Sequence, residues 1–172
     1  RNDVTAEEYL EMIRLKTAVL LAASLKIGAR LGGASVEDAD RLYDFGMHIG
    51  VAFQLKDDLL DVYGNAKVFG KNIGGDILCN KKTYMLIKAL EHANADQHNQ
   101  LNSWINAETF QPAEKIAAVT ELYDRIGVKA VCENKILEYS NWAMESLAAV
   151  SIAEEKKEEL KKIIENLIHR EV

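Results

Sequence analysis

The sequence lacks several features that would divide the chain or tie it to an oxidising compartment. It contains one proline, Pro112, no low-complexity run and only two cysteines. No proline- or glycine-rich linker separates two blocks, so we expect residues 1–172 to form a single domain. Cys79 and Cys132 have neither the spacing of a zinc site nor that of a disulfide framework. Unpaired cysteines suit a reducing compartment, and we expect a cytoplasmic protein.

Long hydrophobic runs and clustered positive charge are also missing. The longest purely apolar run, residues 18–23, is far shorter than the roughly 20 residues that span a bilayer. No signal-peptide pattern opens the chain. The formal net charge is −6, and the basic residues do not form the stripe, interleaved with aromatic residues, that a nucleic-acid surface requires. We expect neither an integral membrane protein nor a nucleic-acid-binding one.

Strand signals are absent, whereas helix starts and stops recur along the chain. The capping-box pattern Thr5-x-x-Glu8 begins a helix that we expect to run to about Leu31, before two glycines. Hydrophobic residues make up 48% of the chain, enough for a sizeable core. The sequence therefore predicts an all-α protein, with further helices over residues 35–63, 81–91, 96–107, 112–127, 128–150 and from 151 onward.

The first helix suggests that the chain is incomplete. Residues 19–23, Val-Leu-Leu-Ala-Ala, are apolar on every side of a helix, which is typical of a helix buried all round. The chain also starts at Arg1 rather than at methionine. We expect a fragment whose first helix needs more neighbours than residues 1–172 supply.

The stretch FQLKDDLLDVYG, residues 53–64, places carboxylates inside an apolar helix. At 100° per residue, the polar side chains of this stretch fall within about 100° of arc, and apolar residues lie on both flanks. The polar residues are Gln54, Asp57, Asp58 and Asp61. Neighbouring charges about 5–6 Å apart repel by roughly 3 kcal/mol at an effective dielectric near 20, so a cation is expected. Mg²⁺ binds through one or two carboxylates and takes phosphate oxygens for the remainder. The stripe predicts a magnesium-phosphate site, and a solvated helix face is the alternative.

Lysines from three segments could meet such a phosphate. Lys71 lies in the glycine-bearing loop that follows, and Lys81 and Lys82 stand at the expected start of a helix, where positive charge opposes the helix dipole. That arrangement favours a nearby anion; an exposed basic loop is the alternative. Lys16 interrupts the apolar first helix, so it should meet a carboxylate or phosphate, or else extend to the surface.

Taken in order, these segments resemble a known family. FQLKDDLLDVYG, GKNIGGD and NKKT resemble the second aspartate-rich motif and the following lysine loop of the trans-isoprenyl diphosphate synthases, also called polyprenyl synthetases. Lys16-Thr17 is similar to their K-T motif, and the resemblance covers nearly the whole chain. It implies the later half of an isoprenoid synthase-type helical bundle, usually homodimeric. It also implies a prenyltransferase of the farnesyl or geranylgeranyl class, which ionises an allylic diphosphate with Mg²⁺ and adds the carbocation to isopentenyl diphosphate.

The resemblance assigns a role to each residue that matches a motif. Asp57 would bind magnesium directly, and Asp58 and Asp61 would assist through waters or hydrogen bonds. Thr17 and Gln54 would lie near the developing allylic cation, where their dipoles lower the barrier. The lysines that would hold the allylic diphosphate are Lys16, Lys71 and Lys81, with Lys82 as the alternative to Lys81.

The chain also departs from the family pattern. The family's first aspartate-rich motif and the upstream basic residues that bind isopentenyl diphosphate are absent. We therefore expect this chain to be inactive alone. One alternative is a non-catalytic helical subunit that binds diphosphate or a partner subunit. Another is a terpene cyclase or similar magnesium-dependent diphosphate enzyme, which the GK-x(4)-D and K-T elements disfavour.

Overall fold

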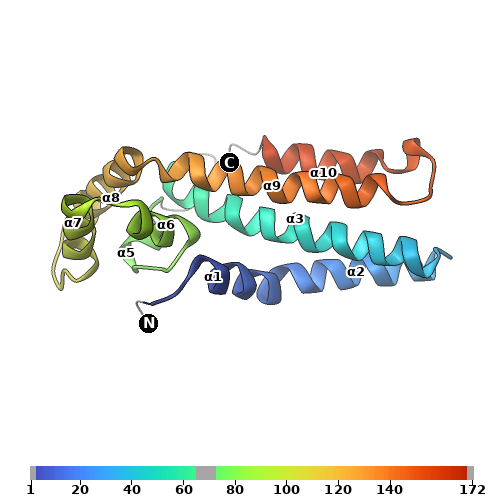
Figure 1. Cartoon of the computed structure of the whole chain (residues 1–172), viewed down its shortest axis with the longest axis horizontal. Helices are drawn as coiled ribbons and strands as arrows, with labels where there is room; N and C mark the ends of the chain where they lie inside the picture. The colour runs from blue at the N-terminus through green and yellow to red at the C-terminus, as the bar shows by residue number, and fades with distance from the viewer. Residues whose placement is uncertain (1–2, 65–72, 170–172) are drawn as a thin grey trace. The chain divides into compact units, whose positions relative to one another are not determined.

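The computed structural model describes residues 3–64 and 73–169, and every regular element in these two ranges is helical. The all-α prediction is confirmed. No helix in the described ranges is both long and apolar enough to cross a membrane. The helices shown in Figure 1 are α1 (Ala6–Ile13), α2 (Val19–Leu31), α3 (Val36–Tyr63), α5 (Gly75–Leu78), α6 (Tyr84–His92), α7 (Ala95–Ile105), α8 (Pro112–Ile126), α9 (Val128–Ala148) and α10 (Glu158–Ile168).

The chain consists of two compact units. The first comprises residues 1–9, 57–133 and 171–172, and the second comprises residues 10–56 and 134–170. The long helices α3 and α9 each contribute residues to both units. The expectation of a single domain over residues 1–172 stays a prediction.

In the second unit, α2 and the residue that precedes it, Ala18, pack closely against α3 through small residues. A Cβ atom added to Gly50 would lie 2.7 Å from the Cα of Ala18, and one added to Gly46 would lie 2.7 Å from the Cα of Ala22. Such distances leave no room for a side chain, so glycine is required on α3 wherever α2 crosses it. Both alanines are fully buried.

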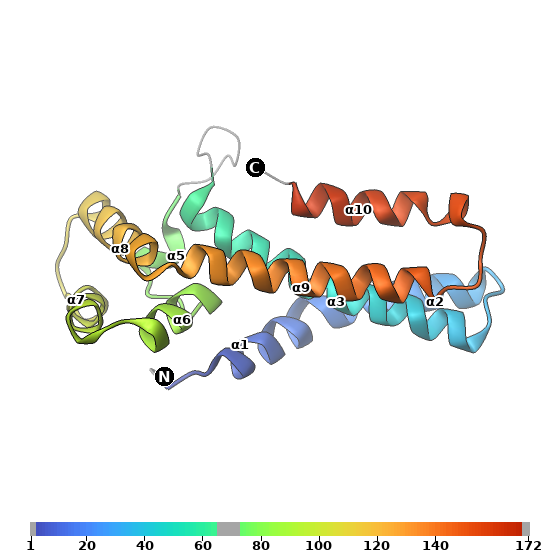
Figure 2. The same ribbon diagram turned by 45° about the horizontal axis from the view of Figure 1, so that its top comes forward.

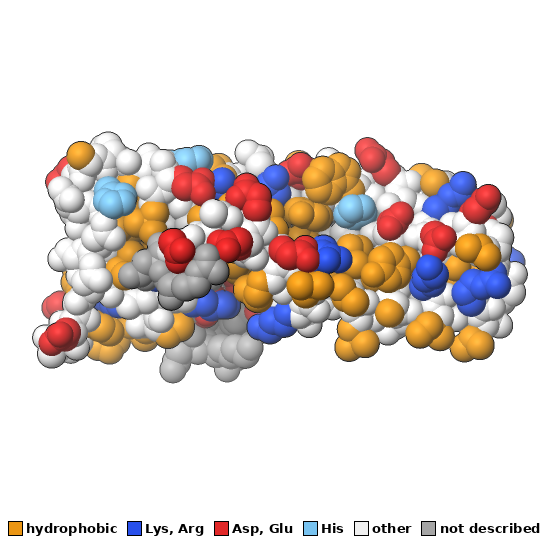
Figure 3. All heavy atoms as spheres, turned by 60° about the horizontal axis from the view of Figure 1, so that its bottom comes forward, with side chains coloured by type: hydrophobic (Ala, Val, Ile, Leu, Met, Phe, Trp, Pro, Cys, Tyr) orange, Lys and Arg blue, Asp and Glu red, His pale blue; other side chains and the backbone are white. Residues whose placement is uncertain are grey.

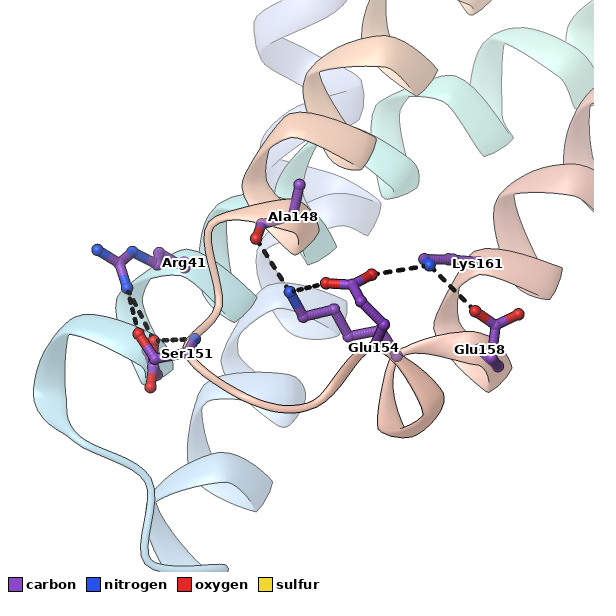
Figure 4. A network of polar contacts seen from close by, with 8 residues as sticks. Arg41, Ala148, Ser151, Glu154, Glu158 and Lys161 are labelled. Atoms are coloured by element: carbon purple, nitrogen blue, oxygen red, sulfur yellow. Dashed lines mark hydrogen bonds and ion pairs between the residues drawn. The ribbon is translucent and has the colours of Figure 1, made fainter.

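The connection from α9 to α10, also in the second unit, is held by polar contacts (Figure 4). The buried Lys157 ammonium donates to the Ala148 carbonyl at the end of α9, at 3.0 Å, and to the Glu154 carboxylate at 2.8 Å. We expected a helix capped at Ser151, but α10 begins at Glu158. The Ser151 N–H donates to Asp38 on α3, at 2.9 Å, which ties the connection to α3, and a 3-10 turn over Glu154–Lys156 precedes α10.

In the first unit, the helices α5, α6, α7 and α8 are grouped together (Figure 2). Lys115 on α8 is buried, and its ammonium donates to the Asn80 side chain at 2.7 Å. The hydroxyl of Thr83 accepts the Leu86 N–H at 3.3 Å and so caps α6. We expected this helix to start at Lys81, but the cap at Thr83 places Lys81 before the first turn. The charge of Lys81 therefore lies outside the helix and does not oppose the helix dipole from inside the first turn.

The first predicted helix differs from the expectation in two ways. Residues Arg14–Ala18 form a π-helical turn between α1 and α2, although the capping box at Thr5 is present as predicted. The helix is also not buried all round within the described residues, since Leu20 is 74% exposed and Leu31 is 85% exposed. Ala18 and Ala22 fill the contact with α3, which leaves the large side chains on the other side.

Candidate functional site

The three aspartates of α3 have different environments in the first unit. Asp58 is only 1% exposed, whereas Asp57 and Asp61 are partly exposed. Leu59, Leu60 and Val62 around them are buried, as the apolar flanks of the stripe predicted. The stripe is therefore a half-buried helix edge with one carboxylate deep inside the unit.

Asp58 is held by two donors from distant parts of the sequence. The hydroxyl of Tyr9, on α1, donates to one carboxylate oxygen, and the ammonium of Lys81 lies 3.0 Å from the other. Burial raises the pKa of Asp58 above its ordinary value, although the hydrogen bonds from Tyr9 and Lys81 oppose the shift. Burial, together with the charge of Asp58, also raises the pKa of the Tyr9 hydroxyl. Asp58 thus anchors α1 and the segment before α6 to α3.

Asp61 contacts the start of α5. Its side chain accepts the Asp76 N–H at 2.8 Å, and its backbone carbonyl accepts the Gly74 N–H at 2.6 Å. Burial raises the pKa of the Asp61 carboxyl. These bonds use one oxygen of Asp61 and bring the Asp76 carboxylate next to the stripe.

Lys81 bridges two of these carboxylates. Its ammonium lies 2.8 Å from Asp76 as well as 3.0 Å from Asp58, and its side chain is 38% exposed. Burial opposes the charge, but the hydrogen bonds to Asp76 and Asp58 raise the pKa of Lys81, so it stays protonated. An ammonium has three N–H donors, and one remains for a ligand oxygen. Within residues 3–64 and 73–169, Lys82 forms no ion pair.

The remaining predicted residues lie in the second unit or outside the described ranges. The Thr17 hydroxyl donates to the Gln54 side chain at 3.3 Å, so the structure brings this predicted pair together. Lys16 is exposed on the π-helical turn, and π-helical turns occur frequently at functional sites. Lys71 lies outside the described residues.

Two of the carboxylates keep oxygens that a divalent cation could use. In the described part of the chain, no group of three or more His, Cys, Asp or Glu residues could hold a metal ion, and no hydrogen bond or ion pair engages the side chain of Asp57. Asp61 keeps one oxygen beyond the one that binds the Asp76 N–H. Two oxygen donors without an all-protein cage suit Mg²⁺, which keeps waters and substrate oxygens as ligands. Both carboxylate oxygens of Asp58 already accept hydrogen bonds, one from Tyr9 and the other from Lys81.

Sequence reasoning did not include Tyr9 in the site. The residues Ala6, Tyr9 and Ile13 repeat at helical spacing and are all buried. A buried tyrosine hydroxyl usually finds a hydrogen-bond partner, so this spacing was the available signal. The partner, Asp58, could not be identified from the sequence because it lies on another helix.

Comparisons with known proteins identify the family of this chain. The polyprenyl synthetase family model matches residues 1–123. The short chain isoprenyl diphosphate synthase of Methanothermobacter thermautotrophicus is 37% identical over 171 residues, which cover 99% of this chain and 51% of that protein. The chain thus spans about half the length of the curated relatives it matches.

Solved structures give the same result. A crystal structure of geranylgeranyl pyrophosphate synthase superposes with a TM-score of 0.91 and 36% identity, over 100% of this chain and 54% of that one. A geranylgeranyl pyrophosphate synthase from Corynebacterium glutamicum, complexed with isoprenyl diphosphate and magnesium, superposes with a TM-score of 0.87 and 30% identity, over 98% of this chain and 48% of that one. The chain belongs to the polyprenyl synthetase family.

Proposed function

We propose that this chain carries one half of the active site of a magnesium-dependent prenyltransferase, which joins an allylic diphosphate to isopentenyl diphosphate. The observation that carries the proposal is the pairing of two available carboxylates, Asp57 and Asp61, with the charged ammonium of Lys81 in one unit. Carboxylates hold a metal and an ammonium holds phosphate oxygens. The magnesium and isoprenyl diphosphate bound to the Corynebacterium protein support the same chemistry.

Each residue has a defined task in this proposal. Asp57 and Asp61 would hold Mg²⁺, which would neutralise the diphosphate and so make it a better leaving group. Lys81 donates its remaining N–H to a phosphate oxygen, and Asp58 and Asp76 fix the position of that ammonium.

The other residues that we propose for the active site belong to the second unit and to the glycine-bearing loop. Lys16 and Lys71 add positive charge to the diphosphate. Thr17 and Gln54 direct their dipoles at the allylic cation as it forms, where preorganised dipoles lower the barrier. Their hydrogen bond to each other keeps both side chains in a defined orientation.

The finer features of the proposal concern the whole protein. We propose short-chain products of the farnesyl or geranylgeranyl class, a homodimeric assembly and a cytoplasmic location. Residues 1–172 alone would lack activity because they do not contain the family's first aspartate-rich motif, which would bind the remaining magnesium ions, or the basic residues for isopentenyl diphosphate.

The activity is tested in a protein that contains both halves of the fold. This chain is joined to the segment of the Methanothermobacter relative that it does not match. The fusion is incubated with an allylic diphosphate, labelled isopentenyl diphosphate and Mg²⁺. We expect a labelled, chain-extended product, and a loss of at least a hundredfold in rate for Asp57→Ala and for Lys81→Ala. The matched control Glu121→Gln, an exposed acid on α8, keeps the parent rate.

Binding to the chain alone provides a second measurement. Titration calorimetry with Mg²⁺ and inorganic pyrophosphate should show binding that Asp57→Asn weakens and Glu121→Gln does not. Product formation that survives Asp57→Ala and Lys81→Ala would refute the assigned site. Pyrophosphate binding by a fusion that forms no product would instead favour the non-catalytic subunit.

A further inference from the structure

Lys115, on α8, is a buried lysine without an acidic partner. Its side chain is 1% exposed, and its ammonium donates to the Asn80 side chain at 2.7 Å and lies 4.2 Å from the centre of the Phe110 ring. Within residues 3–64 and 73–169, no carboxylate forms an ion pair with it. Lysines normally lie at the surface, as do the Lys and Arg side chains that Figure 3 shows on one face of the molecule. A buried charge that no carboxylate neutralises lowers stability, so stability alone does not explain Lys115.

Asn80, the acceptor of that hydrogen bond, has an unusual backbone conformation. Its φ is 53°, in the left-handed region that residues with a side chain rarely adopt and that asparagine tolerates better than most. The side chain is held on both sides, because its amide nitrogen donates to the Ile105 carbonyl at 2.9 Å and its oxygen accepts from Lys115. These two bonds fix the direction in which the chain leaves Asn80.

The residue that follows Asn80 is Lys81, whose ammonium lies between two carboxylates. It is 3.0 Å from Asp58 and 2.8 Å from Asp76. The Lys81 N–H also donates to the Asp76 carbonyl at 3.0 Å, so the backbone closes the turn that leads to Lys81. A different φ at Asn80 would change the path of the chain into Lys81 and move its ammonium relative to Asp58. The left-handed residue therefore determines whether Lys81 reaches both carboxylates.

Lys115 has no room to contact a phosphate itself. Lys115, Asn80 and Lys81 line one cavity of about 10 Å³, which is the space for about one water molecule. A phosphate group does not fit into that volume. Lys115 can therefore influence a ligand at Lys81 either through Asn80 or through its charge at a distance.

We propose that Lys115 is a positioning residue for Lys81, because it clamps Asn80 in the left-handed conformation from which the Lys81 ammonium reaches its two carboxylates. An apolar side chain of similar length at position 115 would fill the same space but would leave the Asn80 oxygen without its donor. The clamp itself follows from the geometry. That the positioned ammonium holds a diphosphate oxygen rests on the proposed function.

Two variants separate the clamp from the charge of Lys115. Lys115→Met removes the ammonium and keeps a side chain of similar length, whereas Asn80→Gly keeps the ammonium and removes the clamped side chain. Glycine adopts positive φ readily, so Asn80→Gly allows the same backbone path without holding it. Lys115→Met should have a thermal midpoint at least as high as that of the parent, because it removes a buried charge. A structural role alone would lower that midpoint.

The first test observes the Lys81 ammonium without any ligand. An ammonium held by two carboxylates exchanges its protons with water slowly, so its signal should be visible in NMR spectra of the chain with isotope-labelled lysine. The absence of the signal from Lys81→Met identifies it. We expect Lys115→Met and Asn80→Gly to shift or broaden this signal, and the matched control Arg125→Met, at an exposed position of α8, to leave it unchanged. A signal that is missing from the parent, or that neither variant changes, would overturn the proposal.

The second test measures the binding of inorganic pyrophosphate with Mg²⁺ by titration calorimetry. Lys115→Met and Asn80→Gly should each weaken binding at least about fivefold, and the double variant should bind no more weakly than the weaker single variant, because both changes interrupt one clamp. If Lys115→Met weakens binding by the same factor in the parent and in Asn80→Gly, Lys115 acts through its charge and the proposal is overturned. A parent chain that binds no pyrophosphate, while its Lys81 signal still depends on Lys115, would refute the proposed function and support the clamp.

Discussion

The contact between Tyr9 and Asp58 makes a sharp prediction about the stability of the first unit. The change Tyr9→Phe removes one oxygen atom and leaves the buried ring in place. Asp58, at 1% exposure, would then have lost a donor that water cannot replace. Lys81 stays, but its ammonium bonds the other carboxylate oxygen and is shared with Asp76.

The expected cost follows from the charge and burial of the acceptor. A hydrogen bond to a charged group contributes about 1.5–3 kcal/mol to stability. For a chain of this size, 1 kcal/mol lowers the thermal midpoint by about 2–4 °C, so Tyr9→Phe should lower it by roughly 3–12 °C. The bond stabilises the ionised form of Asp58, so its contribution is lost as the pH falls and the carboxyl becomes protonated. The loss should therefore be smaller near pH 4 than at pH 7.

Urea and thermal unfolding, followed by circular dichroism at both pH values, measure this loss. The matched control is Tyr43→Phe, which removes the same atom from a half-buried tyrosine whose hydroxyl makes no hydrogen bond within the described ranges. We expect the control to change stability by less than about 0.5 kcal/mol. If Tyr9→Phe is as stable as the parent at pH 7, Asp58 is not anchored by Tyr9 and the account of the site is wrong.

Three further predictions test other parts of the structure by the same unfolding measurements. Gly50→Ala should destabilise the second unit by about 1–3 kcal/mol, because its Cβ would lie 2.7 Å from the Cα of Ala18. Gly28→Ala, which meets nothing within 4 Å, should be neutral or slightly stabilising, and equal effects of the two substitutions would contradict the close approach at Gly50. Thr83→Ala should lower the free energy of unfolding by about 1 kcal/mol because it removes the N-cap of α6, whereas Thr83→Ser should keep most of that stability. If the alanine variant is as stable as the parent, the cap does not contribute to stability. Burial beside Tyr139 and Trp142 lowers the pKa of His48 below its ordinary value. The free energy of unfolding should therefore fall as the pH drops below about 6.5, where the histidine of the unfolded chain gains a proton. His48→Gln should make the free energy of unfolding less dependent on pH in this range, and an identical dependence in both proteins would show that His48 is not its cause.

Helix content and the acidic stripe could be predicted because both depend on local spacing. The capping box at Thr5, the polar face of α3 and the helix ends near Tyr63 and Gly127 follow from residues a few positions apart, and the structure contains them. The family resemblance depended on the same short motifs.

The distinction among the three aspartates could not be predicted from spacing. Asp57 and Asp58 are adjacent in sequence, yet Asp58 is buried and Asp57 is partly exposed. The difference is made by Tyr9 and Lys81, which reach Asp58 from other helices and segments. Contacts between residues far apart in sequence require the tertiary structure, and the same holds for Lys157 against Ala148 at the end of α9.

The π-helical turn at Arg14–Ala18 has a consequence for the angular position of α2. A π-helix accommodates one more residue in its turn than an α-helix does, and one residue corresponds to about 100° of rotation. Restoring regular α-helix here without removing a residue would turn everything that follows by that angle relative to Leu10–Ile13. Ala18 and Ala22 could not then face Gly50 and Gly46 while the preceding turn kept its own contacts. The π-helical turn sets the angle at which Thr17 meets Gln54, so the backbone conformation at this point is as constrained as the side-chain chemistry.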